Sequence, residues 1–96
     1  MDSKNLFQVT MNESMDISKA QELKNQLQEA LLQQDGIHLD MSNLERIDTA
    51  VIQLLMIFAK TAESKKIPIE WDRQSNVFNR AVRILNVEEY FFQTAA

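Results

Sequence analysis

Three short segments of the chain have residue patterns typical of β-strands. Residues 6–11 alternate apolar and polar side chains, and residues 37–41 are partly β-branched and bounded by turn formers. Residues 67–71 form the third segment. Pro68 cannot donate a hydrogen bond to a neighbouring strand, so we expect the third strand to lie at an edge of the sheet or to begin near this residue.

Two longer segments repeat their apolar residues at the spacing of one helix face. The first contains Ala20, Leu23, Leu27, Ala30 and Leu31, and the second contains Val77, Phe78, Ala81, Val82 and Leu85. Ser18, with Gln21 three residues later, predicts a capping box for the first helix, and Gly36 is expected to stop that helix. Ser75 is expected to cap the other helix. Residues 87–92 predict a short helical piece at the end.

A further helix, predicted from about Thr49 to Ser64, is apolar on more than one side. Its first apolar stripe can pack on the sheet and consists of Val51, Leu54, Leu55, Phe58 and Ala62. Its second stripe consists of Ile52, Met56 and Ala59. One layer cannot bury both stripes. The second stripe therefore lies under a neighbouring helix, or part of it is exposed for a partner.

The order of these elements predicts a single α/β domain over residues 1–96. Strands separated by helices in so short a chain imply right-handed crossovers, which bring the helices onto one face of a sheet. The expected fold is a small mixed sheet with helices packed largely on one face.

Composition excludes several classes of protein. Acidic residues outnumber basic residues by 14 to 10 without a Lys/Arg-rich run, so nucleic acid is not an expected partner. The absence of cysteine removes disulfides, thiolate metal sites and thiol nucleophiles. The longest apolar run, residues 51–59, is far shorter than the roughly 20 residues of a membrane span. We expect a soluble cytoplasmic protein that folds without metal, cofactor or disulfide.

Asp40 and Asp48 are the acids best placed for chemistry. They lie at the predicted end of a strand and start of a helix, positions that can meet at one end of a sheet. The Asp48 carboxylate can cap the helix, or the two carboxylates together can bind a metal ion, although hard cations prefer more oxygen ligands. Asp40 alone can be a phosphoaspartate of the receiver type. Thr49 can be a second cap or a phosphoacceptor at the helix start.

The remaining polar side chains form no catalytic constellation. His38 is the only histidine and is interpreted as structural, and Gly36 is the only glycine, so the chain has no glycine-rich phosphate loop. Trp71, Tyr90, Phe91 and Phe92 are expected to pack in the core and at the C-terminal end rather than to form a ligand cage. We therefore expect a protein that is not an enzyme.

Residues 39–71 resemble the STAS domain, the module of bacterial anti-sigma-factor antagonists and of the cytoplasmic tails of sulfate transporters. The family pattern is a strand ending in Leu-Asp-Leu-Ser, a short loop, and then Asp-Ser/Thr-small-Gly at the start of an apolar helix. Residues 39–42 (LDMS) match the first part, and residues 48–50 (DTA) match the second. Residues 15–27 and 77–91 are similar to the first and last helices of the family.

The chain departs from this pattern at two positions. Val51 replaces the family glycine, and Ala50 replaces the serine that is often phosphorylated in sporulation-type antagonists. Thr49 matches a threonine in a related group that includes the STAS subunit of bacterial phospholipid-transport ABC systems, where it matters for binding the ATPase.

The resemblance implies a non-catalytic regulatory module that acts by partner switching with an anti-sigma factor or a switch kinase. The alternatives are a STAS subunit that binds an ABC ATPase and a chemotaxis-associated STAS protein. Thr49 is the candidate phosphoacceptor. The residues expected to bind the partner are Ser42, Asn43, Asp48, Thr49, Ile52 and Met56.

Overall fold

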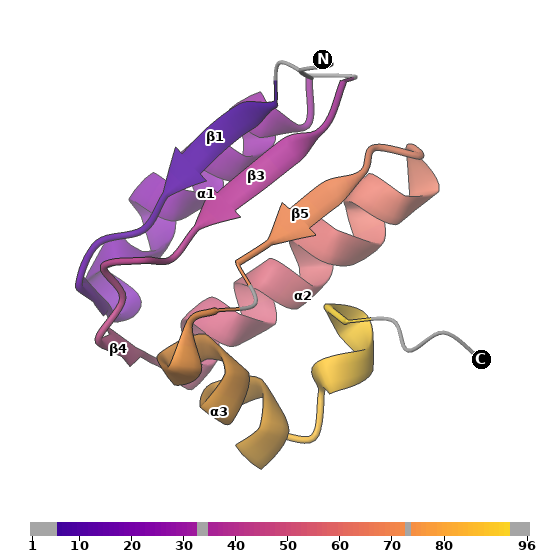
Figure 1. The fold of residues 1–96 in the computed structure, drawn as a ribbon. Coiled ribbons are helices and arrows are strands. Elements are labelled where there is room, and N and C mark those ends of the chain that lie inside the picture. The colour runs from indigo at the N-terminus through magenta and orange to yellow at the C-terminus, as the bar shows by residue number, and fades with distance from the viewer. Residues whose placement is uncertain (1–5, 33–34, 73, 93–96) are drawn as a thin grey trace.

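The computed structural model describes residues 6–32, 35–72 and 74–92, and it contains a three-stranded sheet, which Figure 1 shows. The strands lie in the spatial order β1 (Phe7–Thr10), β3 (Ile37–Asp40) and β5 (Ile69–Trp71). All three predicted strands are confirmed, with slightly shorter bounds. Pro68 directly precedes β5, which lies at the sheet edge, so both expectations for this residue hold. We expected a mixed sheet, but every strand pair among the described residues is parallel.

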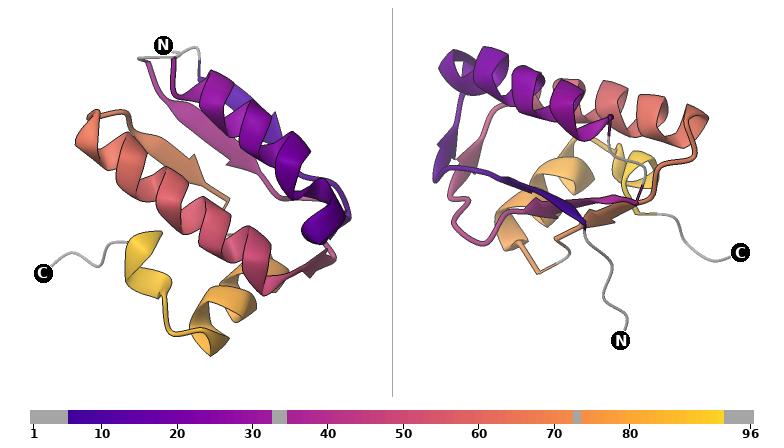
Figure 2. Two further views of the ribbon diagram at one scale, coloured as in Figure 1. Left: turned by 180° about the vertical axis from the view of Figure 1, so that it is seen from behind. Right: turned by 90° about the horizontal axis from the view of Figure 1, so that it is seen from above.

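The helices that connect the strands lie on one face of the sheet. Figure 2 shows α1 (Ala20–Ala30) and α2 (Thr49–Ser64) side by side above the strands. The chain continues after β5 into α3 (Asn76–Ile84) and the short 3-10 helix η2 (Glu88–Tyr90). The predicted bounds of α2 are confirmed, and the fold is the expected α/β arrangement. No helix in the described part of the chain is long and apolar enough to cross a membrane.

Apolar and polar residues alternate along the strands, so one face of the sheet is apolar and the other is polar. Val9, Ile37 and Leu39 are buried beneath the helices. The register places Gln8, His38 and Glu70 in one row on the opposite face, where His38 Nδ1 lies 2.9 Å from Glu70 Oε1. That face is polar because successive side chains of a strand point to opposite sides.

The predicted caps of the first and third helices have different outcomes. Ser75 Oγ accepts a hydrogen bond from the Phe78 N–H at 3.2 Å, so this N-cap is confirmed. The capping box at Ser18 is wrong, because the Ser18 N–H itself donates to the Asp16 carboxylate at 3.0 Å. This contact opens the 3-10 helix η1 (Ile17–Lys19), so helical structure begins before the predicted cap. The Gln21 side chain instead donates to Asn25.

Gly36 is required at the start of β3 and does not stop the first helix, which ends at Ala30. Its φ of 133° is a backbone conformation that favours glycine. A Cβ at this position would lie 2.7 Å from Leu6 Cδ2. The positive φ therefore explains the glycine, and the close approach of the Leu6 side chain adds to this preference.

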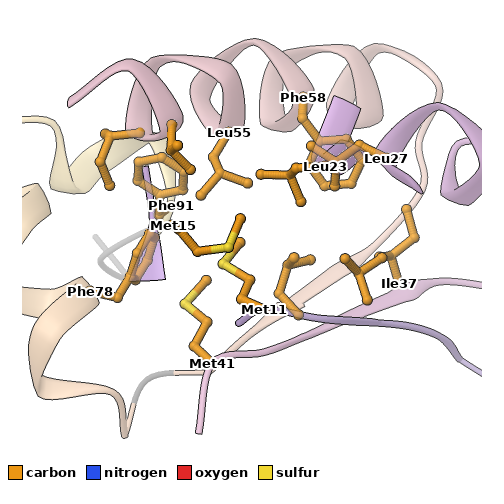
Figure 3. Close-up of a cluster of buried hydrophobic side chains, with 14 of the residues drawn as sticks. Met11, Met15, Leu23, Leu27, Ile37, Met41, Leu55, Phe58, Phe78 and Phe91 are labelled. Carbon is orange, nitrogen blue, oxygen red and sulfur yellow. The ribbon is translucent and has the colours of Figure 1, made fainter. Parts of the chain in front are cut away.

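The core fills the space between the helices and the sheet. Figure 3 shows side chains of α1 and α2, including Leu23 and Leu55, pointing toward Met11, Met15 and Met41. Met11 and Met41 lie directly after β1 and β3 at the carboxyl end of the sheet, and Met15 lies in the short strand β2 (Ser14–Met15) that follows β1 along the chain. Their flexible side chains suit the irregular space beneath the loops at this end.

Aromatic residues join β5 to the C-terminal helices. The Trp71 and Phe78 rings are stacked with centroids 5.8 Å apart, and Phe91 meets Trp71 edge-on at 4.8 Å. The expected packing role is confirmed for Trp71, Phe91 and Phe92. Tyr90 differs, because its ring is 37% exposed and lies beneath the Lys60 ammonium group.

Candidate functional site

The loop between β3 and α2 begins with a turn built by Asp40. Its Oδ1 atom accepts hydrogen bonds from the Ser42 N–H at 3.0 Å and from the Ser42 hydroxyl at 2.8 Å. The Ser42 N–H is the largest cause of a lowered Asp40 pKa, and the hydroxyl adds to it against the opposing effect of partial burial. These contacts stabilise the carboxylate and commit the Ser42 hydroxyl to the turn.

Backbone hydrogen bonds fix the middle of this loop. Residues 46–47 form β4 (Arg46–Ile47), which pairs in parallel with β2 (Ser14–Met15). The N–H groups of Glu45 and Arg46 donate to the Glu13 carbonyl at 2.7 and 2.9 Å. Sequence reasoning assigned this pair to a turn and a loop, because two-residue strands show no periodicity. The pairing holds α2 at a defined place relative to β2.

Asp48 occupies the N-cap position of α2 but does not cap with its side chain. Its backbone carbonyl accepts the hydrogen bonds from the N–H groups of Val51 and Ile52, while its carboxylate makes no capping bond. The expected side-chain cap is therefore wrong. The Asp48 N–H donates to the Met15 carbonyl at 3.0 Å, so pairing with β2 positions the helix start.

Thr49 is the first residue of α2, and its side chain is exposed. Among the described residues its hydroxyl has no hydrogen-bond partner, so the interpretation as a second cap is wrong. The hydroxyl is thus accessible to a partner or to a kinase.

The second apolar stripe of α2 is largely covered. Ile52 is only 1% exposed, Ala59 is buried, and Met56 is partly buried against the core. Both α1 and α3 contact α2, so neighbouring helices cover the sides that the sheet does not reach. Ile52 cannot touch a partner while the core is intact, which corrects its place among the expected contact residues.

Exposed residues of α2 recur at helical spacing along one side of the helix. Those before the last turn form what we call the outer stripe: Thr49, Gln53, Ile57 and Lys60. Ile57 is 64% exposed and is the apolar centre of the stripe. Ile57 was not identified as a contact residue by the sequence analysis. A signal was present, because this apolar residue belongs to neither of the two apolar stripes of α2.

The structure divides the sequence-predicted residues between the two ends of one loop. Asp48 and Thr49 adjoin at the head of α2, whereas Ser42 and the exposed Asn43 follow β3. Asp72, whose carboxylate links the end of β5 to the end of β3, was not identified by the sequence analysis. It accepts hydrogen bonds from the N–H groups of Met41 at 3.2 Å and Gln74 at 3.1 Å.

The fold does not group Asp40 and Asp48 with further side chains that could bind a metal ion. The part of the chain that the structure describes holds no group of three or more His, Cys, Asp or Glu side chains that could bind a metal ion. Asp40 Oδ2 lies 3.5 Å from Gln8 Nε2 on the open face of the sheet, whereas Asp48 begins a helix that covers the other face.

Residues 3–93 match a protein family described as "Mlab, STAS domain". The matched region includes the sheet, the loop from Asp40 to Asp48 and the outer stripe. Comparison with curated proteins gave no match.

Proposed function

The chain belongs to the STAS-domain family, and on that premise we propose that it is a non-catalytic regulatory module of the cytoplasm that binds a protein partner. STAS domains are often regulatory or protein-binding. The observation that carries the proposal is Ile57, an aliphatic side chain that is 64% exposed at the centre of a polar helix face. Its support comes from its place on the same helix face as the exposed Thr49, which gives an apolar centre with polar neighbours, as in the core and rim of a binding surface.

The proposed contact surface consists of the outer stripe, the partly buried Met56 at its edge and the loop before α2. It retains Ser42, Asn43, Asp48, Thr49 and Met56 from the sequence-based set, with Ile57 in place of the buried Ile52. The proposed partner is an anti-sigma factor or a switch kinase. Partner switching requires a residue whose charge can change within the surface, and phosphorylation of Thr49 would supply that change.

A specific observation favours a second candidate partner, the ATPase of an ABC transporter. Ala50 occupies the position that resembles the phosphorylated serine of sporulation-type antagonists, and alanine cannot accept a phosphate. The accessible hydroxyl of Thr49 then serves as a contact rather than as a switch. The same surface supports both proposals, and the identity of the bound protein separates them.

The test is affinity purification from the native cell extract with ATP, with ADP and without nucleotide, followed by mass spectrometry. We expect the wild-type protein to retain one specific partner, a kinase or anti-sigma factor under the first proposal and an ABC ATPase under the second. Replacing Ile57 with Glu places a charge at the apolar centre of the surface. This Ile57→Glu variant should bind at least about 10-fold more weakly, as expected for loss of a central anchor.

Leu32→Glu is the matched control, because Leu32 is an aliphatic residue beyond the end of α1 that is even more exposed than Ile57, at 78%. This variant should retain the partner at the wild-type level. Failure to recover any specific partner under the three nucleotide conditions would count against a protein-binding role. If Ile57→Glu and Leu32→Glu weakened partner binding equally, the outer stripe would not be the contact surface.

A further inference from the structure

A second apolar surface lies between β4 and α3, where Figure 1 shows the two elements next to each other. It is a groove of about 480 Å³ with apolar walls formed by Ile47, Val77, Ala81 and Ile84. Ile84 is 73% exposed, and the other three side chains are partly buried. None of the residues that line the groove belongs to α2.

The groove follows from a second apolar side on α3. Phe78 and Val82 are buried in the core, whereas Val77, Ala81 and Ile84 recur at helical spacing on an adjacent side. Packing against the core therefore uses only one side of α3. The second side meets β4 incompletely, and a row of apolar atoms stays in contact with solvent.

The rim of the groove is basic, although the whole chain is acidic. Two basic residues, Arg46 and Arg80, line the groove together with one acidic residue, Glu45. Helix α3 contains two arginines and no acidic residue, in a chain with a net charge of −4. Arg83 pairs with Glu88 at 3.8 Å, while Arg80 is exposed and has no ion pair within the described residues.

We propose that this groove binds an acidic protein segment whose aliphatic or aromatic side chains enter it and whose carboxylates pair with Arg80 and Arg46. The volume lies in the range of about 300–1,000 Å³ that is usual for ligand clefts, which suffices for a few side chains of a peptide. An anionic membrane or a nucleic acid is a poorer occupant, because only two arginines line the groove. The net charge of −4 opposes an extended array of phosphates more strongly than a short segment with a few carboxylates. The proposal extends beyond the outer stripe and adds a second docking surface.

The probe is a displayed library of random 12-residue peptides, selected on the immobilised wild-type protein. Enriched peptides are synthesised, and their affinities are measured for the wild type, Ile84→Glu and Arg80→Glu. Both replaced side chains are exposed, so the variants should fold, and their melting temperatures verify this. Leu32→Glu and Lys24→Glu are matched controls on exposed positions away from the groove.

We expect the enriched peptides to combine acidic residues with large apolar residues. Ile84→Glu and Arg80→Glu should each weaken their binding at least 10-fold, whereas the two controls and Ile57→Glu should change it less than 2-fold. Absence of enrichment, a basic consensus, or binding that survives Ile84→Glu would overturn the proposal. Binding lost with Ile57→Glu and kept with Ile84→Glu would also overturn it and would instead assign the peptide to the outer stripe.

Discussion

Asp16, Asp40 and Asp72 each accept a hydrogen bond from the backbone N–H two residues further along the chain. Each of them follows or ends a strand, at the point where the chain turns away from its sheet. A carboxylate at this position satisfies an N–H group that the strand ladder no longer pairs. These aspartates therefore have a structural role that is separate from any role in partner binding.

Asp40 gives a prediction for the dependence of stability on pH. Its pKa is lowered in the folded protein, first by the Ser42 N–H and then by the Ser42 hydroxyl. The charged carboxylate thus stabilises the fold above the ordinary pKa of about 3.9, and this contribution is lost as the pH falls through the lowered value. Replacing Ser42 with Ala removes one donor and should raise the Asp40 pKa, as measured by a carboxyl ¹³C NMR titration.

The pair formed by Asp16 and Ser18 is an internal control in the same spectra. The Ser18 hydroxyl is the largest cause of the lowered Asp16 pKa, so Ser42→Ala should leave the Asp16 titration unchanged. Ser18→Ala should raise the Asp16 pKa and leave the Asp40 titration unchanged. An unchanged Asp40 pKa in Ser42→Ala would show that the hydroxyl does not stabilise the carboxylate in solution.

Thr49 provides a second prediction at the residue scale. Because its hydroxyl has no hydrogen-bond partner in the described structure, Thr49→Ala should melt within about 1 °C of the wild type. If the hydroxyl contacts the partner, the same variant should lose about 1 kcal/mol of binding free energy, or roughly 5-fold in affinity. We favour this contact role, because Asp48 already places negative charge beside Thr49.

Thr49→Glu separates the contact role from a phosphorylation switch. A switch predicts that Thr49→Ala binds as tightly as the wild type while Thr49→Glu, which adds charge at the interface, binds weakly. Under the contact role both variants bind weakly. Affinities and melting temperatures of the three proteins, measured together, decide between the two mechanisms.

At the scale of elements, α2 and α3 each have more apolar surface than the sheet can cover. In α2 the neighbouring helices cover the surplus except at Ile57. In α3 the surplus lines the groove beside β4. Both exposed surfaces remain because packing against the core and the neighbouring elements covers only part of the apolar surface of each helix.

The contacts of the Phe78 ring give a prediction of how much the packing of α3 on the core stabilises the protein. Phe78 is fully buried, and its ring contacts Trp71, Phe91 and Phe92. Replacing Phe78 with Ala should lower the free energy of unfolding by about 3–5 kcal/mol, through lost burial and the cavity that remains. Chemical denaturation measures this change.

Ile84→Ala serves as the comparison on the same helix. Ile84 is 73% exposed, so this variant should change the free energy of unfolding by no more than about 0.5 kcal/mol. If Phe78→Ala were as mild, α3 and η2 would not share the core of the sheet in solution.

For the molecule as a whole, the core should be sufficient for folding. The chain has no cysteine, and its described residues contain no cluster of three potential metal ligands. We expect a chelator and a reductant each to leave the melting temperature unchanged within about 1 °C. A decrease of several degrees with chelator alone would restore the interpretation of Asp40 and Asp48 as metal ligands, and Asp40→Asn should then abolish that decrease.

The sequence by itself determined the features that depend on neighbouring residues. Periodicity located α2 and the three strands of the larger sheet, Pro68 indicated an edge or strand start, and Ser75 was recognised as a cap, because each rests on interactions within a few residues. The STAS pattern around Asp48 and Thr49 is likewise local, and it identified the family.

The tertiary structure decided the features that depend on residues far apart in the sequence. The pairing of β2 with β4 joins segments about 30 residues apart, and no local pattern specifies it. The same is true of Gly36, where an added Cβ would meet the Leu6 side chain, and of Ile52, whose burial depends on neighbouring helices. Periodicity shows that a side of a helix is apolar, but only packing decides whether another element covers it, as the exposure of Ile57 demonstrates.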